Sequence, residues 1–287
     1  MLIDTHAHLN FAAFNNDREE MIKKCLDNNV WIINAGTKYE TSKKAVEIAN
    51  KWKEGVYAAI GLHPIHLATG IIKVKTDPAE GGFTAKGECF CISKYKKLAQ
   101  SSKVVAIGEI GLDYYYAPQI SKDSFSNTEQ AQKRFDLFCR KQKELLLEQI
   151  KLAKELNLPI IFHCRKAHQD LIKILKAEFS DLSSKGVVHC FTGRWKEAEE
   201  YLKMGFYLGF NGIIFKLDLK EIIKKTPLER ILVETDCPYL KPPEFPEERN
   251  NPLAVKLIIQ RVAEIKNLNF QTVAEATFKN AKELFGI

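Results

Sequence analysis

The chain has 287 residues, of which 45% are hydrophobic and 28% charged, and its formal net charge is +7. This is the composition of an ordinary globular protein, and no apolar run approaches the roughly 20 residues that cross a bilayer, so we do not expect a membrane protein. The positive charge permits a polyanionic partner, although a solvated lysine-rich surface explains it equally well.

Cysteine usage bears on the compartment of the protein. Seven cysteines are scattered along the chain without the spacing of a disulfide framework, which indicates a reducing environment. The first predicted strand begins at residue 2, and cleavage of a signal peptide would remove it. We therefore expect a cytoplasmic protein, with the nucleus as an alternative, and not a secreted one.

Short apolar segments alternate with segments of helical periodicity along most of the chain. Eight of the apolar segments are predicted to be buried strands, which end near residues 8, 36, 62, 110, 163, 189, 210 and 236. Helices are predicted at about 15–29, 39–53, 93–101, 127–157, 169–178, 195–204 and 219–225, with two more within 251–287. Eight strand-then-helix units in about 250 residues predict an α/β fold, the TIM (β/α)8 barrel.

The alternation stops between about residues 69 and 91. Turn residues separate two segments of alternating polarity there, which predicts a hairpin-like insertion after the third strand. Cys89 and Cys91 lie in this insertion, but their spacing is atypical of zinc sites and no second pair answers it, so a structural role is favoured. We find no linker or internal repeat and predict one domain over residues 1–287.

Metal-binding residue types stand at the ends of five predicted strands. They are His6 and His8, Glu109, His163, His189 and Asp236. The carboxyl ends of the strands carry the active site of a TIM barrel. One histidine in such a place is more often a hydrogen-bonded core residue, but burying unpaired imidazoles and carboxylates together at one end would cost several kcal/mol. We therefore predict a metal site, with His6 and His8 on one face of the first strand.

Four histidines and two carboxylates are enough for one or two divalent ions, with Glu109 as the natural bridge between two. A pair of such ions activates water and stabilises the oxygens of a displaced phosphate ester. Asp236 can bind one ion and accept the proton of the attacking water, so Glu109 and Asp236 are the predicted catalytic residues. The donor types fit Mg²⁺, Mn²⁺ or Zn²⁺ and do not distinguish them.

Two further side chains are candidates for substrate binding. Arg165 lies two residues beyond His163 and therefore on the same face of an extended strand, where a guanidinium suits a phosphate group, although a structural ion pair explains it equally well. His63 follows the third strand and either contacts substrate or caps a turn.

Residues next to the proposed ligands are expected to support them. Asp4 and Glu234 share the inward face with the ligands two residues later and are candidates to orient them. Cys164, Cys190 and Cys237 each directly follow a proposed ligand, so a period of two turns them toward the helices as packing residues.

The motifs together resemble those of a known family. They are Asp4-Thr5-His6-Ala7-His8, Gly61-Leu62-His63-Pro64, Gly108-Glu109-Ile110-Gly111-Leu112-Asp113-Tyr114, His163-Cys164-Arg165, His189-Cys190-Phe191-Thr192-Gly193 and Glu234-Thr235-Asp236-Cys237-Pro238-Tyr239-Leu240. This set is similar to the TatD family of metal-dependent deoxyribonucleases, in order from residue 2 to the C-terminus. The resemblance implies a barrel of the metallo-dependent hydrolase superfamily, a DNase activity that is often 3′–5′ exonucleolytic, and metal ligands at the six positions named above.

Three functions remain open at this stage. The first is hydrolysis of DNA, with single-stranded DNA or 3′ ends as substrate and neither a membrane nor an obligate protein partner. The second keeps the metal site but cleaves a C–N or ester bond, for example in a D-aminoacyl-tRNA, because a metal-activated water attacks a carbonyl as well. The third is a non-catalytic nucleic-acid-binding barrel, against which the complete set of ligands argues.

Overall fold

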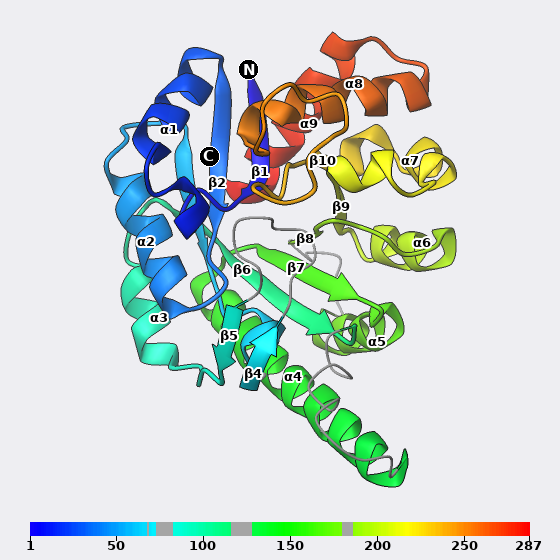
Figure 1. The fold of residues 1–287 in the computed structure, drawn as a ribbon. Coiled ribbons are helices and arrows are strands. Elements are labelled where there is room, and N and C mark those ends of the chain that lie inside the picture. The colour runs from blue at the N-terminus through cyan, green and yellow to red at the C-terminus, as the bar shows by residue number, and fades with distance from the viewer. Residues whose placement is uncertain (68, 73–82, 116–127, 180–185) are drawn as a thin grey trace.

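Eight parallel strands follow one another in chain order around a barrel (Figure 1). The computed structural model describes residues 1–67, 69–72, 83–115, 128–179 and 186–287. The barrel strands are β1 (Leu2–Ala7), β2 (Val30–Ala35), β3 (Val56–Ile60), β6 (Val104–Asp113), β7 (Ile160–Arg165), β8 (Gly186–Val188), β9 (Tyr207–Phe210) and β10 (Ile231–Val233). The predicted TIM barrel is confirmed, although β6 continues three residues beyond its predicted end near residue 110.

Hydrogen bonds at the mouth join the first strand to the last. The Asp236 N–H donates to the His6 carbonyl at 2.8 Å and the His8 N–H donates to the Cys237 carbonyl at 2.9 Å. The Thr5 hydroxyl also donates to the Val233 carbonyl at 3.1 Å. These bonds bring the two ends of the sheet together, so His6, His8 and Asp236 meet although more than two hundred residues separate them.

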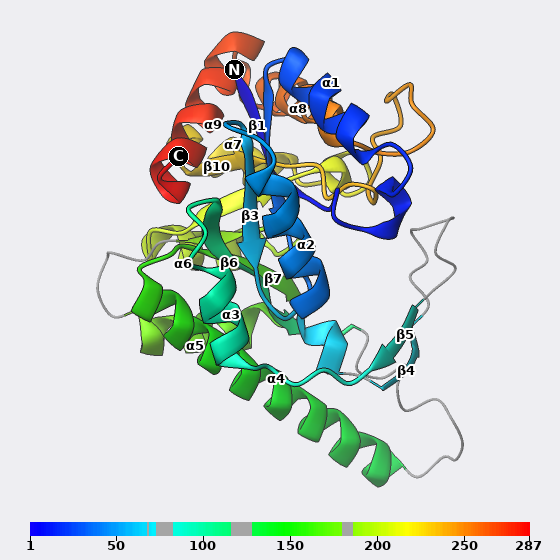
Figure 2. The same ribbon diagram turned by 90° about the vertical axis from the view of Figure 1, so that its left-hand side faces the viewer.

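Helices surround the barrel (Figures 1 and 2). They are α1 (Arg18–Asp27), α2 (Tyr39–Asn50), α3 (Ile92–Leu98), α4 (Thr128–Leu156), α5 (His168–Glu178), α6 (Trp195–Lys203), α7 (Lys220–Lys225), α8 (Val255–Lys266) and α9 (Phe270–Phe285). Short 3-10 helices are η1 (Ala12–Phe14), η2 (Pro64–Leu67), η4 (Gly212–Phe215), η5 (Leu228–Arg230) and η6 (Pro252–Ala254). No helix in the described part of the chain is both long and apolar enough to cross a membrane.

The core has two parts because every barrel strand is buried on both faces. One cluster contains residues of all eight strands, among them Ile3, Ile161 and Leu232, and therefore fills the barrel interior; Leu284 and Phe285 of α9 belong to it. The other cluster lies between the strands and the surrounding helices. Since apolar side chains fill the interior, the polar residues of the strand ends gather at the mouth.

The predicted hairpin after the third barrel strand is confirmed. Strands β4 (Thr69–Ile72) and β5 (Phe83–Lys86) pair antiparallel, and residues 73–82 between them lie outside the described residues. Figure 2 shows this hairpin projecting from the body of the barrel. Glu88, which follows β5, connects the hairpin to the body of the protein. The Glu88 N–H donates to the His66 carbonyl at 2.9 Å, and the Glu88 carboxylate accepts from the Tyr39 N–H at 2.9 Å.

Candidate metal centre

A cavity of about 1520 Å³ opens at the carboxyl ends of the strands. Its lining includes His8, His63, Glu109, His163, His189 and Asp236. Arg165 also lines it, while His6 is fully buried behind it. The structure therefore brings all of the site residues predicted from the sequence to one place.

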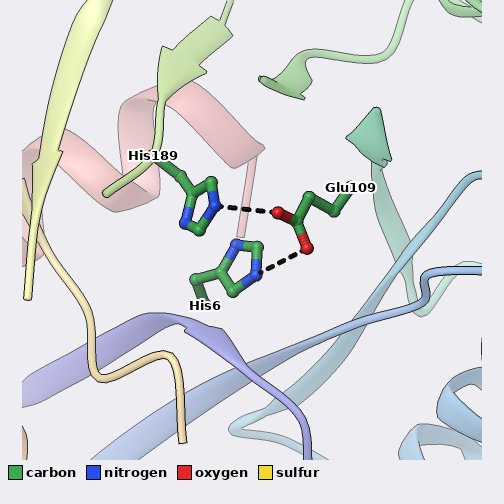
Figure 3. A group of neighbouring side chains, drawn as sticks. All are labelled: His6, Glu109 and His189. Carbon is green, nitrogen blue, oxygen red and sulfur yellow. Dashed lines mark ion pairs between the residues drawn. The ribbon is translucent and has the colours of Figure 1, made fainter. Parts of the chain in front are cut away.

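Glu109 lies at the centre of this group, with one carboxylate oxygen toward each of two histidines (Figure 3). Its Oε1 lies 2.8 Å from His189 Nε2 and 2.8 Å from His163 Nδ1, and its Oε2 lies 3.4 Å from His6 Nε2. Burial alone would raise the pKa of this carboxyl, but the nearby rings of His63, His189 and His6 outweigh it and hold the pKa well below its ordinary value. Glu109 is therefore ionised at neutral pH.

A second group forms where the first and last strands meet. The Nε2 atoms of His6 and His8 lie 3.2 Å apart, and Asp236 Oδ1 lies 3.3 Å from His8 Nε2 and 3.8 Å from His6 Nε2. Asp236, three residues beyond the end of β10, has a φ of 56°, in the left-handed region that non-glycine residues seldom adopt. Ligand atoms of His6, His8 and Asp236 all lie within 4.8 Å of one another, as close as a shared ion requires.

Acceptors behind three of the rings determine which nitrogen faces the centre. His8 Nδ1 lies 2.9 Å from the Ala35 carbonyl, which can only accept, so this nitrogen carries the proton and Nε2 keeps its lone pair. His189 Nδ1 similarly faces Glu234 Oε1 at 3.2 Å, and His163 Nε2 faces Asp113 Oδ2 at 3.1 Å. Each ring thus keeps one nitrogen on an outer acceptor, so that the other nitrogen can face a metal ion at the centre.

His63 differs from these rings in its hydrogen bonding. Its Nδ1 accepts from the Ile65 N–H at 3.1 Å, and burial lowers the pKa of the ring, so the neutral tautomer carries its proton on Nε2. That Nε2 lies 3.5 Å from Glu109 Oε1. Although His63 is close enough to Glu109 and His163 to share an ion with them, its tautomer makes it a hydrogen-bond donor at the mouth.

The electrostatics of the centre favour a cation. Burial would lower the pKa of His163, but hydrogen bonds to Asp113 and Glu109 outweigh burial and raise it to about 9. His189 behaves likewise, because Glu109 and Glu234 outweigh burial and raise its pKa well above the ordinary value. The carboxylates therefore attract positive charge to the place where the ring nitrogens converge. Nitrogen and oxygen donors in this arrangement fit a divalent metal ion.

Arg165 lies at the end of β7, where an aromatic ring supports it. Its guanidinium carbon lies 3.8 Å from the centroid of the Tyr115 ring, and the Lys166 ammonium lies 5.6 Å from the same centroid. Both side chains, like Tyr115, line the cavity. A guanidinium that already rests over a ring loses less freedom when it binds an anion.

The expected supporting residues act in different ways. Glu234 holds the His189 ring, as described above. Asp4 instead binds the last strand: its carboxylate accepts from the Thr235 N–H at 2.9 Å and from the Thr235 hydroxyl at 2.5 Å. Asp113 was not among the predicted site residues, although a β6 strand that runs to residue 113 places it on the same face as Glu109.

The three cysteines next to the proposed ligands do not share one environment. Cys164 and Cys237 are buried in the cluster between strands and helices, as expected, although Cys164 also lines the cavity. Cys190 is half-buried, has a φ of 44° and lines the cavity, so its predicted place among the packing residues is wrong. Burial raises the pKa of its thiol to about 12, which keeps it protonated at neutral pH.

An eight-stranded barrel with histidines and carboxylates around a buried glutamate at its mouth defines a metal-dependent hydrolase. The sequence matches the family model described as TatD related DNase over residues 3–286. The chain belongs to this TatD family.

Relatives and a solved structure agree with this assignment over the full length. The uncharacterized metal-dependent hydrolase YabD of Bacillus subtilis is 39% identical, and the match covers 100% of both chains. The 3′–5′ ssDNA/RNA exonuclease TatD of Erwinia tasmaniensis is 31% identical, again over 100% of both chains. The structure of YjjV, a TatD homologue of Escherichia coli K12, has a TM-score of 0.77 at 28% identity and covers 100% of this chain and 98% of that one.

Proposed function

We propose that the protein hydrolyses phosphodiester bonds of DNA with the help of divalent metal ions, as a 3′–5′ exonuclease on single-stranded DNA or 3′ ends. The observation that carries the proposal is the convergence of ring nitrogens and carboxylates on Glu109 at the floor of an open cavity. The family description and the exonuclease relative support DNA as the substrate, and a net charge of +7 agrees with a polyanion.

Six residues would hold the metal. They are His6, His8, Glu109, His163, His189 and Asp236. We assign one ion to the side of His6, His8 and Asp236, a second to the side of His163 and His189, and Glu109 to both. Divalent ions in this place would lower the pKa of a bound water and neutralise charge that develops on the phosphate. Mg²⁺, Mn²⁺ and Zn²⁺ all accept such donors.

Asp236 is the proposed general base. Its side chain is 16% exposed whereas that of Glu109 is 6% exposed, so Asp236 is the carboxylate more open to water in the cavity. Burial would raise its pKa, but the neighbouring rings of His8, His189 and His6 lower it, and the group is ionised at neutral pH. An ionised carboxylate in contact with the cavity can accept the proton of the attacking water at Oδ.

Arg165 and His63 are the proposed contacts to the DNA backbone. The guanidinium of Arg165 lies over the Tyr115 ring, and a guanidinium can donate two parallel hydrogen bonds to one phosphate. The Nε2–H of His63 projects toward Glu109 and can donate to a second oxygen of the same group. Together they would fix the scissile phosphate over the carboxylate cluster.

Cleavage of end-labelled single-stranded DNA tests the proposal. The wild type is treated with EDTA and then given Mg²⁺, Mn²⁺ or Zn²⁺, beside Asp236→Asn and the control Asp218→Asn, an exposed aspartate in the turn before α7. We expect metal-dependent ladders from 5′-labelled DNA and immediate release of the label from 3′-labelled DNA. Asp236→Asn should lower the rate by roughly 10²–10⁴-fold, and Asp218→Asn should cleave like the wild type.

Other outcomes contradict the proposal in distinct ways. If no metal restores cleavage while a D-aminoacyl-tRNA is deacylated, the same centre serves an acyl hydrolase. If DNA binds but neither substrate is cleaved, the barrel is a binding protein. Cleavage by Asp236→Asn at the wild-type rate would remove Asp236 from its proposed role.

A further inference from the structure

Two buried glutamines of α4 make the same unusual contact with two different strand ends. The side chains of Gln142 and Gln149 are both fully buried, at 0% exposure. Gln142 accepts from the Asp113 N–H at 2.8 Å and donates to the Asp113 carbonyl at 2.9 Å. Gln149 accepts from the Leu62 N–H at 2.8 Å and donates to the Leu62 carbonyl at 3.0 Å. Each side-chain amide therefore bonds both the N–H and the carbonyl of one residue, as an antiparallel strand would.

The sheet itself explains why these peptide groups need a partner from a helix. Strand β3 ends at Ile60, and its pairing with β6 ends where Ile60 lies opposite Ile107. Both Leu62 and Asp113 lie beyond that point and are buried. An unpaired buried N–H or C=O costs roughly 1–3 kcal/mol, and a glutamine amide supplies both a donor and an acceptor. Seven residues are about two helical turns, so the two side chains lie on the same face of α4.

Each of the two pairs leads to a different part of the metal centre. Asp113, held by Gln142, places its carboxylate 3.1 Å from His163 Nε2 and so directs His163 Nδ1 toward Glu109. Leu62, held by Gln149, directly precedes His63, whose Nε2–H faces the cavity. Neither glutamine lines the cavity, so neither can contact a substrate bound there.

We propose that Gln142 and Gln149 are positioning residues with separate tasks: Gln142 sets the metal affinity on the His163 side, and Gln149 sets substrate binding through His63. This inference rests on the proposed function for its substrate half only. The metal half depends on the chain's own residues and can be measured without any reaction. Because the two glutamines have equal burial and equal bonding, each serves as the matched control for the other.

The test compares Gln142→Met with Gln149→Met, since methionine keeps the volume but loses both hydrogen bonds. Mn²⁺ binding to the metal-free protein is measured by calorimetry, with melting temperature as the check on folding. We expect Gln142→Met to weaken the binding of one Mn²⁺ ion about three- to tenfold, less than the 10–100-fold typical of losing a direct partner of a ligand. Gln149→Met should keep Mn²⁺ affinity within about twofold but raise the KM for single-stranded DNA several-fold.

Double substitutions show whether each glutamine acts through its assigned partner. If Gln142 acts through Asp113, then Asp113→Asn should weaken the same Mn²⁺ site, and adding Gln142→Met should change it little further. Asp113→Asn combined with Gln149→Met should give additive effects. If Gln142→Met fails to fold, the single variant Asp113→Asn still tests whether this side of the centre binds Mn²⁺ through Asp113.

One pattern of results overturns the inference. If both glutamine variants lose Mn²⁺ affinity and raise KM in parallel, in proportion to their loss in melting temperature, the amides serve packing alone. If the wild type cleaves no DNA, the proposed function fails, but unequal Mn²⁺ affinities of the two variants would still support the role of Gln142, and equal ones would refute it.

Discussion

At the scale of single residues, the centre depends on which nitrogen of each histidine is free. A carbonyl behind His8 and carboxylates behind His163 and His189 leave the inward nitrogens of these rings available. His6 lacks such support, and its buried Nδ1 has no hydrogen-bond partner among the described residues. We infer that His6 is held mainly by its neighbours, since its ring stacks on that of His189 with 3.9 Å between centroids.

Removing the charge behind His189 should weaken metal binding without unfolding the protein. Glu234→Gln keeps an acceptor oxygen for His189 Nδ1, the Cys190 N–H and the Asn211 amide but makes the imidazole less basic. We expect Mn²⁺ affinity, measured by calorimetry, to fall about tenfold. Glu229→Gln, at an exposed position, is the control and should bind like the wild type. Unchanged affinity in Glu234→Gln would show that the charge plays no part.

Two half-buried histidines outside the set of proposed ligands should make the protein sensitive to acid. Burial lowers the pKa of His66 to about 3 and that of His168 to about 4, from an ordinary value of 6.5. Below pH 6.5 the unfolded chain therefore binds more protons than the folded one, and stability that is complete above pH 6.5 is lost as the pH falls toward 4.

Urea unfolding of the EDTA-treated protein between pH 7 and 4 measures this loss. The double variant His66→Gln and His168→Gln should show a flatter dependence of unfolding free energy on pH than the wild type, because two groups that charge on unfolding are gone. Equal slopes would assign the acid sensitivity to other groups.

At the scale of elements, the contact between β1 and β10 assembles the first metal group. The side chain of Thr235 supports this contact, because its hydroxyl donates to Asp4 and accepts from the Cys237 N–H at 3.2 Å. Thr235→Val keeps the shape but leaves the buried carboxylate of Asp4 short of a donor. We expect the unfolding free energy to fall by about 1–3 kcal/mol in urea titrations. Thr192→Val, at an exposed position, should change it by less than about 0.5 kcal/mol. A loss in Thr235→Val no larger than in this control would contradict the assigned role.

The strands and the proposed ligands could be predicted because their signals are local. Each strand is a short apolar segment, and each proposed ligand lies in such a segment or within three residues of its end, as His189 follows Val187 and Val188. Once the strands are ordered as a barrel, their ends must meet, so the prediction of one site needed no contact information.

Contacts between elements distant in sequence could not be predicted in this way. Gln142 and Gln149 look like ordinary polar positions of a long helix, and only the early end of β3 gives them partners. Asp113 falls outside the predicted strand because the sequence gives no sign that β6 continues to that residue. Cys190 lines the cavity because its backbone turns into the left-handed region, which breaks the period of two used to place it.

At the scale of the whole molecule, substrate binding should depend on salt. The net charge is +7, and Arg165 and Lys166 stand at the cavity. If phosphate contacts dominate, the KM for single-stranded DNA should rise as a power of the salt concentration, because bound phosphates release counterions. Arg165→Gln should reduce that slope, whereas Lys97→Gln, on the outer helix α3, should leave it unchanged. A KM independent of salt would exclude a phosphate-based interface.

The central claim is that the cluster around Glu109 is a metal centre. A crystal grown with MnCl₂ and measured at the manganese absorption edge tests it most directly. We expect anomalous peaks beside Glu109, one among His6, His8 and Asp236 and one next to His163 and His189. In crystals of Glu109→Gln, the first peak or both peaks should be lost. A map without peaks at these residues, from a crystal with Mn²⁺ in the surrounding solution, would contradict it.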